Sequence, residues 1–260
     1  GGQDFWSNGI HLNLIEAAAD PAEESWRNIN AMNDFVLSLL TATDQLTVAA
    51  LYGSAGAGGV MMALGADRVL AREGIVLNPH YKGMGGLYGS EYWTYSLPQR
   101  VGAELAERLT EQCLPISVQE AKALGLIDDI IIQDDLGSDR AGRFEEQIER
   151  IAVSLARSDR FDAMLARKRE ERSADERIKP LESYRLEELA AMKENFWGED
   201  PSYHLARSAF VRKQPRPTHL KSSATLERLC RNPGCEDPGR ALPSRCAFTS
   251  QGWRERRPAA

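Results

Sequence analysis

The sequence WSNGIHLN occupies residues 6–13, and GSAGAGG occupies residues 53–59, where it runs into an apolar helical pattern. Glycine adopts backbone conformations closed to other residues and lets a ligand approach the main chain. The first N–H groups of a helix have no intrahelical partner and carry partial positive charge. Two such donors from separate segments can form an oxyanion hole. Either segment alone fits an ordinary turn, whereas their order and spacing together favour the oxyanion hole.

The segments around GSAGAGG alternate between strand and helix patterns. Residues 23–40 have the apolar period of a helix, and Asp20 before Pro21 is typical of a helix start. The apolar run at 46–51 predicts a buried strand that leads to the glycines. The other expected elements are helices at 57–66, 97–109, 117–124, 143–158, 160–172 and 186–196 and strands at 68–71, 75–77 and 127–132. This order of a strand, a helix and two further strands predicts an α/β fold with right-handed connections.

The charges on the last three expected helices alternate and are interpreted mainly as solvated faces. A basic cluster at 167–172 leaves an anion site as an alternative.

The length and the composition of the chain limit the classes of protein to which it can belong. With 260 residues, 42% of them hydrophobic, the chain can bury a full core in one or two domains. No apolar run approaches the roughly 18 residues of a membrane span, and no signal peptide opens the sequence, so a cytoplasmic protein without membrane contact is expected. The four cysteines form neither a disulfide framework nor a zinc pattern, and no metal is predicted. Because the chain begins at Gly1–Gly2 without Met, we expect a fragment that starts inside a domain.

The last fifty residues differ chemically from the rest. From Val211 onward there are 11 Lys and Arg against 4 Asp and Glu, a net charge of about +7, which leaves about −13 for residues 1–210. This part also holds half of the 12 prolines and three of the four cysteines, without any hydrophobic period. We predict a disordered basic tail at 214–260. Nucleic-acid binding is not expected, because neither interleaved aromatic residues nor a known module accompanies the charge.

A long glycine-rich loop carries the candidate catalytic groups. Residues 78–96 read NPHYKGMGGLYGSEYWTYS, and loops of this kind usually line a site. A Glu91 carboxylate desolvated among the tyrosines would have a raised pKa, as a general acid or base requires. Tyr81 is its expected partner, with His80 adjacent, although a structural hydrogen bond is the favoured role for His80. In the alternative interpretation Glu91 caps a helix that begins near Tyr92.

Several segments resemble the crotonase superfamily, the enoyl-CoA hydratases and isomerases: WSNGIHLN, AALYGSAGAGGVMMALGADRVLA, VLNPH, and LPQRVG with LTEQCLPISVQEAKALGLID. NPHYKGMGGLYGSEYWTYSLPQRVG, FWSNGIHLN and KPLESYRLEELAAMKENFWGEDPSYHLAR more closely resemble the C-terminal domain of the HoxX family of hydrogenase-maturation proteins. The resemblance implies an α/β spiral of strand-strand-helix repeats over residues 1–135, with its start missing. A C-terminal helical region is expected over residues 136–213.

The crotonase resemblance also implies a site. A CoA thioester would place its carbonyl oxygen between the N–H groups of Asn8 and Gly58, where fixed donors stabilise developing charge. The remaining contacts to CoA are expected from Ile10, Leu12, Gly56 and Gly59. Where hydratases carry their two catalytic glutamates, this chain has Met61 and His80. Since methionine cannot transfer a proton, ordinary hydration of an enoyl-CoA is not expected.

The maturation-protein resemblance implies a more specific reaction. Such proteins take a formyl group from formyl-tetrahydrofolate in an N-terminal domain, here expected to be missing, and pass it to CoA. The crotonase-like domain then breaks formyl-CoA down to CO for the iron of nickel-iron hydrogenase. Glu91 and Tyr81 would handle the formyl proton, and other hydrogenase-maturation proteins are the expected macromolecular partners.

Two other functions stay open. A generic acyl-CoA isomerase or hydrolase would use Glu91 alone on a longer acyl chain and would need a roomy acyl pocket. A formyl group would instead fit a pocket closed by Met61, Met62 and the tyrosines. A non-catalytic assembly module would not bind CoA at all.

Overall fold

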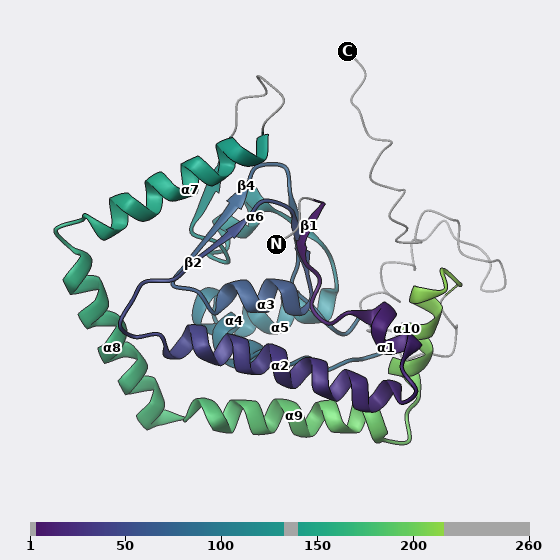
Figure 1. Ribbon diagram of the computed structural model, residues 1–260. Helices are drawn as coiled ribbons and strands as arrows, with labels where there is room; N and C mark the ends of the chain where they lie inside the picture. The colour runs from purple at the N-terminus through teal and green to yellow at the C-terminus, as the bar shows by residue number, and fades with distance from the viewer. Residues whose placement is uncertain (1–3, 133–139, 216–260) are drawn as a thin grey trace, which may run out of the picture.

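The structure is a computed structural model that describes residues 4–132 and 140–215 (Figure 1). Its strands are β1 (Phe5–Ser7), β2 (Val48–Leu51), β3 (Ser54–Gly56), β4 (Arg68–Arg72), β5 (Val76–Asn78), β6 (Ile116–Ser117) and β7 (Asp129–Ile131). Its helices are α1 (Leu12–Ala17), α2 (Pro21–Thr41), α3 (Gly58–Leu64), α4 (Trp93–Val101), α5 (Ala103–Gln112), α6 (Val118–Ala123), α7 (Arg140–Ala156), α8 (Phe161–Ile178), α9 (Leu181–Trp197) and α10 (Ser202–Val211). The expected domain boundary at 135 and the tail prediction, from residue 216 onward, lie outside the described residues.

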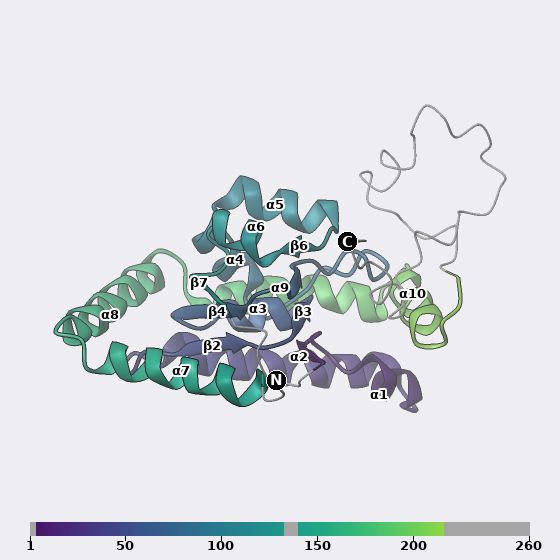
Figure 2. The ribbon, with the colours of Figure 1, turned by 90° about the horizontal axis from the view of Figure 1, so that it is seen from above.

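Two small sheets carry the spiral. One has the order β1-β3-β5-β6 and the other β2-β4-β7, and every pair is parallel except β5 with β6. The chain passes from β2 to β3, through α3, and on to β4 and β5, so each repeat adds one strand to each sheet. The predicted α/β spiral of strand-strand-helix repeats is therefore confirmed. In Figure 2 the strands lie between α5 and α6 on one side and α2 and α7 on the other.

Most predicted elements are confirmed, with ends that differ by a few residues. Asp20 caps α2 by accepting the N–H groups of Ala22 and Glu23, and Pro21 is its first residue. The prediction of one helix over 97–109 is wrong, because Gly102 has φ +81° and divides it into α4 and α5. A residue with a positive φ cannot continue a right-handed helix. The short elements β1, α1, β3 and β6, and also α10, were not predicted.

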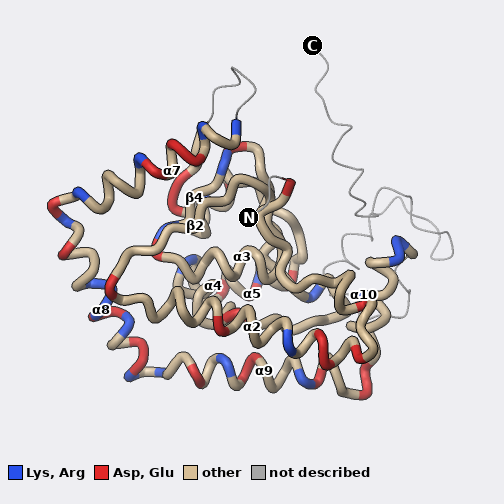
Figure 3. Tube along the Cα trace, in the orientation of Figure 1, with Lys and Arg blue, Asp and Glu red and all other residues tan. Residues whose placement is uncertain are grey.

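The helix that follows the glycines lies at the centre of the fold. Its residues are almost all buried, and none is charged, as the uncharged α3 in Figure 3 shows. A methyl group on Gly59 would lie 2.0 Å from the carbonyl oxygen of Ser7, so only glycine allows the end of β1 to pack this close to α3. This contact keeps the loop after β1 against the first turn of the helix.

The C-terminal helices pack around this core. The helix α9 lies beside α2 (Figures 1 and 2), and Phe144 of α7 packs edge-on against Tyr52, with ring centroids 5.4 Å apart. In α10, the Tyr203 hydroxyl hydrogen-bonds Ser25 of α2 at 2.7 Å. Because Arg207 also donates to Glu16 of α1 at 3.0 Å, α10 ties together the two helices that follow the β1 loop.

The basic cluster of α8 is used inside the protein. Lys168 donates to Asp67 at 2.7 Å and to the Gln45 carbonyl at 2.9 Å, and Arg169 donates to the Thr43 carbonyl at 3.0 Å. These contacts fasten α8 to the segment between α2 and β2 and to Asp67, just before β4. Arg167 and Arg172 pair with Glu171 and Glu176 of the same helix, and the anion site stays a prediction.

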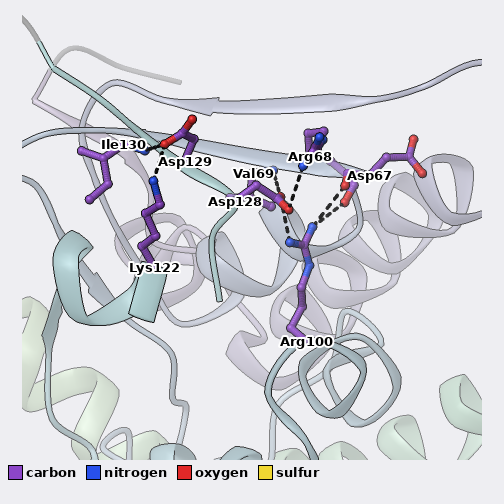
Figure 4. Close-up of polar contacts among 9 residues, drawn as sticks. Asp67, Arg68, Val69, Arg100, Lys122, Asp128, Asp129 and Ile130 are labelled. Atoms are coloured by element: carbon purple, nitrogen blue, oxygen red, sulfur yellow. Dashed lines mark hydrogen bonds and ion pairs between the residues drawn. The ribbon is translucent and has the colours of Figure 1, made fainter. Parts of the chain in front are cut away.

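An ionic cluster joins α4 to the three-stranded sheet (Figure 4). Asp128 accepts the Val69 N–H at 2.7 Å and the Arg100 guanidinium at 2.8 Å, and Arg100 also donates to the carbonyls of Ala66 and Asp67. Both charged side chains are mostly buried, with exposed fractions of 17% for Arg100 and 20% for Asp128. Removing one partner therefore leaves polar groups without a hydrogen-bond partner at a site that is largely shielded from water.

We expect Arg100→Met to lower the free energy of unfolding by about 2 kcal/mol, because Asp128 and two carbonyls lose their donor. Urea unfolding followed by circular dichroism measures this change. The matched control is Lys122→Met, which breaks the neighbouring ion pair with Asp129 (Figure 4). Since both members of that pair are about half exposed, its loss should cost less than about 1 kcal/mol. Equal losses in the two variants would contradict the argument.

No helix among the described residues is long and apolar enough to cross a membrane.

Candidate active site

Tyr81 and Glu91 meet at the two ends of the glycine-rich loop between β5 and α4. The Tyr81 hydroxyl lies 2.5 Å from Glu91 Oε2 and 3.0 Å from the Ser90 carbonyl oxygen. Both side chains are buried, with exposed fractions of 7% and 2%. The tyrosine ring fits because Gly89, at φ +96°, has no side chain where a methyl group would lie 2.1 Å from the ring. The loop is therefore folded tightly around this pair.

The carboxyl group of Glu91 faces the start of α3. A methyl group on Gly58 would lie 3.1 Å from both Glu91 oxygens. One on Gly9 would lie 3.1 Å from the Gly58 nitrogen, and one on Gly56 would lie 3.1 Å from Asn8 Oδ1. The structure thus brings the β1 loop, the GSAGAGG segment and the acidic group to one place. Of the β1 loop residues, Gly9 lies against the Gly58 nitrogen. That the Asn8 N–H contributes to an oxyanion hole stays a prediction.

Burial raises the pKa of Glu91 to about 7, although the hydrogen bond from Tyr81 acts in the opposite direction. Desolvation disfavours the charged form, whereas a donor stabilises it. Burial and the neighbouring carboxylate also raise the pKa of Tyr81 well above its ordinary value. Tyr81 therefore remains a hydroxyl donor, while Glu91 can both accept and release a proton near neutral pH.

We expect Tyr81→Phe to raise the pKa of Glu91 above about 7, because the ionised carboxylate loses its donor. The measurement is a pH titration by NMR of protein labelled with ¹³C at the glutamate side-chain carboxyl, with Glu91→Gln identifying the resonance. Tyr88→Phe is the control, because Tyr88 belongs to the same loop but does not bond Glu91. A midpoint that falls or stays constant in Tyr81→Phe would rule out this role of the hydroxyl.

The other loop candidate, His80, does not join the pair. Its Nδ1 accepts the Gly83 N–H at 3.4 Å, and burial lowers its pKa to about 4. The imidazole is therefore neutral near pH 7, in keeping with the structural role that was favoured for it. Among the described hydrogen bonds, none joins the His80 side chain to Glu91 or Tyr81. A catalytic role for His80 stays a prediction.

The capping interpretation of Glu91 is wrong. The N-cap of α4 is Tyr92, whose own side chain accepts no hydrogen bond from the helix. The N–H groups of Tyr92 and Thr94 donate instead to Glu188 of α9, each at 2.9 Å. Glu188 is completely buried, so the interpretation of the α9 charges as a solvated face also fails at this position. Sequence analysis missed Glu188, and its only signal was an acidic residue within an apolar helical stripe.

Asn33 of α2 is the second residue that sequence analysis missed. Its Oδ1 accepts the Ser90 hydroxyl at 2.6 Å and the Glu91 N–H at 2.7 Å. The side chain is completely buried, and Asn33 lies on the same face as Ile29 and Val36, whose apolar period defined the helix. A polar residue on that buried face was the available signal. It fixes the backbone on the N-terminal side of Glu91.

A groove of about 450 Å³ opens beside the β1 loop. Its lining includes Gly9, Ile10 and His11 together with Met32 and Met62. The contact of Ile10 with CoA stays a prediction, and His11 caps α1 by accepting the Leu14 N–H.

The other predicted CoA contacts lie in different surroundings. Leu12 is the first residue of α1, Gly56 ends β3, and Gly59 is covered by Ser7. Their contacts with CoA stay predictions. Among the described residues, no group of three or more His, Cys, Asp or Glu side chains is arranged to hold a metal ion.

The family model of the enoyl-CoA hydratases and isomerases matches residues 1–188. The chain belongs to the enoyl-CoA hydratase/isomerase family. A solved enoyl-CoA hydratase from Bacillus halodurans, at 20% identity, shares the fold with a TM-score of 0.65 over 80% of this chain and 78% of that one. The strand-strand-helix spiral is thus the fold of a family that is described as enoyl-CoA hydratases and isomerases.

The more similar relatives include a hydrogenase maturation factor. The chain is 48% identical to the hydrogenase maturation factor HoxX of Bradyrhizobium diazoefficiens over 90% of its own length and 40% of that protein. It is 44% identical to a variant of HypX from Aquifex aeolicus, with a TM-score of 0.77 over 87% of this chain and 40% of that one. A HypX structure in complex with tetrahydrofolic acid has a TM-score of 0.76 and 44% identity. The chain therefore spans about 40% of the length of these relatives.

Proposed function

We propose that this crotonase-like domain binds formyl-CoA and breaks it into CO and CoA during the maturation of a nickel-iron hydrogenase. The observation that carries the proposal is the buried Glu91 carboxyl, in contact with the Tyr81 hydroxyl and facing Gly58 at the start of α3. A proton acceptor thus lies beside the donors that a family of CoA-thioester enzymes would use for the substrate carbonyl. The similarity to HoxX and HypX supports the one-carbon substrate.

The reaction needs one proton to move twice. The ionised Glu91 takes the formyl proton, and the N–H groups near Gly58 stabilise the negative charge that its departure leaves on the thioester oxygen. The electrons of the C–H bond become the carbon lone pair of CO, and those of the C–S bond leave with sulfur. Glu91 then returns the proton to the thiolate, which gives CoA. A single carboxyl with a pKa of about 7 can serve in both steps.

The residues at the two hydratase positions support this choice. Met61, completely buried in α3, cannot transfer a proton, and burial lowers the pKa of His80 to about 4, so neither position provides one of the two carboxylates that hydration of an enoyl-CoA would use. Glu91, from the loop, is the acid-base group that remains. The groove beside Ile10 and Met62 is the proposed place for part of the CoA chain.

The formyl group would come from formyl-tetrahydrofolate bound to another part of the longer protein, since a HypX structure contains tetrahydrofolic acid. Other hydrogenase-maturation proteins are the proposed partners that receive CO.

The alternative is a generic acyl-CoA isomerase or hydrolase, which the family match and the open groove favour. The deciding experiment incubates the protein with formyl-CoA and, separately, with acetyl-CoA and crotonyl-CoA. CO is detected by its binding to reduced myoglobin, and free CoA by a thiol reagent. Equimolar CO and CoA from formyl-CoA alone would support the proposal. Turnover of the longer thioesters without CO would overturn it in favour of the alternative, and a failure to bind CoA in calorimetry would leave an assembly role.

A further inference from the structure

The segment that carries Glu91 has an irregular backbone, yet one face of α9 accepts its N–H groups. Tyr88 donates to Asn195 Oδ1 at 2.9 Å, and Gly89 donates to Met192 Sδ at 3.1 Å. Tyr92 donates to Glu188 Oε2 at 2.9 Å. The three acceptors follow the spacing i, i+4, i+7, which places them on the same helical face. A helix from the C-terminal part of the chain therefore shapes the loop.

Glu188 makes the most contacts in this stripe. Besides the Tyr92 N–H, it accepts the Thr94 N–H at 2.9 Å and the Thr94 hydroxyl at 2.6 Å. Its side chain has no exposed surface, and its hydrogen-bond partners in the described part of the chain are Tyr92 and Thr94, neither of them a cation. Because burying an unpaired charge is costly, this position needs a reason beyond the capping of α4, which a neutral side chain could perform.

The backbone beside Glu188 supplies that reason. Glu91 and Tyr92 have φ angles of +63° and +57°, a left-handed conformation that is unfavourable for residues with side chains. Asn33 holds the N–H of Glu91 from α2, and Glu188 holds that of Tyr92 from α9. Strained turns of this kind persist only where surrounding groups fix them, and they occur preferentially at functional sites.

We propose that Glu188 is a positioning residue that fixes the Glu91–Tyr92 turn and, through its charge, sets the pH at which Glu91 exchanges its proton. This inference rests on the proposed acid-base role of Glu91. In this proposal the C-terminal helix α9 positions the acid-base residue of the crotonase-like site.

The electrostatics of the two carboxyls agree with this geometry. Burial, aided by the charge of Glu91, raises the pKa of Glu188 to about 7, although its hydrogen bonds with Thr94 and Tyr92 act in the opposite direction. Coupling between two sites is reciprocal, so the charge of Glu188 must favour the protonated form of Glu91 to the same extent. The other titratable and charged groups that face the pair are Tyr81, Tyr88, Tyr92 and Arg185, the last paired with Asp34 of α2.

The experiment compares Glu188→Gln with Glu187→Gln in protein labelled with ¹³C at the glutamate carboxyls. Gln keeps the size of Glu188 and one acceptor oxygen but removes the charge, whereas Glu187 pairs with Lys179 on the surface. We expect Glu188→Gln to lower the titration midpoint of Glu91 by about one pH unit. The pH profile of CO release should move by the same amount, with a lower kcat and an unchanged KM for formyl-CoA. Glu187→Gln should match the wild type.

The reciprocal variant does not depend on the folding of Glu188→Gln. In Glu91→Gln, the midpoint of Glu188 should fall by the same amount. A midpoint that stays at the wild-type value in either variant would overturn the inference, as would a loss of thermal stability in Glu188→Gln with no shift in the titration. If the wild type released no CO, the proposed function would fail, whereas the titrations would still decide the coupling because they need no substrate.

Discussion

Glu91→Gln is expected to reduce CO release from formyl-CoA by roughly 10²- to 10⁴-fold, the usual contribution of a general acid-base group. Gln fits the same buried space beside Tyr81 but cannot accept the formyl proton. Residual activity would come from the donors near Gly58 alone. The measurement is the initial rate of CO formation at saturating formyl-CoA.

The pH dependence gives a second sign of the same group. Because the ionised form of Glu91 takes the proton, the wild-type rate should rise with pH and level off above about 7. Glu104→Gln, an exposed change in the first turn of α5, is the matched control and should leave the rate and the profile unchanged. Equal CO yields from wild type and Glu91→Gln would remove Glu91 from the mechanism.

Glu91→Gln should lower the activity but, as pH rises, increase the free energy of unfolding relative to wild type. The pKa of Glu91 is raised in the folded protein, so the folded state binds more protons than the unfolded state between about pH 4.5 and 7. Wild-type stability therefore falls as pH rises through this range, by roughly 3 kcal/mol for the single group. Gln remains neutral, and the free energy of unfolding of the variant, relative to wild type, should increase from pH 5 to pH 8. This comparison also shows that the inactive variant is folded.

The second large effect is expected for Gly58→Ala. The new methyl group would lie 3.1 Å from both Glu91 oxygens, so the carboxyl or the first turn of α3 must move by a few tenths of an ångström or more. Because small displacements of reacting groups can cost about 100-fold, CO release should fall by on the order of 10²-fold. Calorimetric titration should also show weaker binding of CoA, since the added group narrows the proposed carbonyl site.

Gly65→Ala is the matched control at the other end of the same helix. Its methyl group would lie 3.2 Å from Val36 Cγ1, a similar crowding, but against an apolar side chain instead of the Glu91 carboxyl. We expect a stability loss of about 1–3 kcal/mol from overpacking and an unchanged rate per folded molecule. If both variants lost activity equally, crowding of α3 rather than the position of Gly58 would explain the result.

The local sequence determined most of the fold. The capped start of α2, the apolar run of β2 and the glycines before α3 each carry a short-range signal, namely a periodicity, a cap or a backbone requirement. The resemblance of these segments to the crotonases then supplied the spiral and the family. The three-residue strand β3 was missed because so short an element depends on its neighbours for hydrogen bonds. The break at Gly102 was missed although a glycine inside a helical pattern is an available signal.

The candidate site divides in the same way. Glu91 and Tyr81 were identified from sequence, since an acidic residue in an aromatic, glycine-rich loop is locally unusual. Their contact, and the raised pKa that follows, depends on burial by segments distant in the chain. Asn33 and Glu188 lie 58 and 96 residues from the backbone groups that they hold, and no local pattern links them. Only the tertiary structure decided which charged residue of α9 is buried, because desolvation and hydrogen bonding at that position arise from the packing of α9 against the loop.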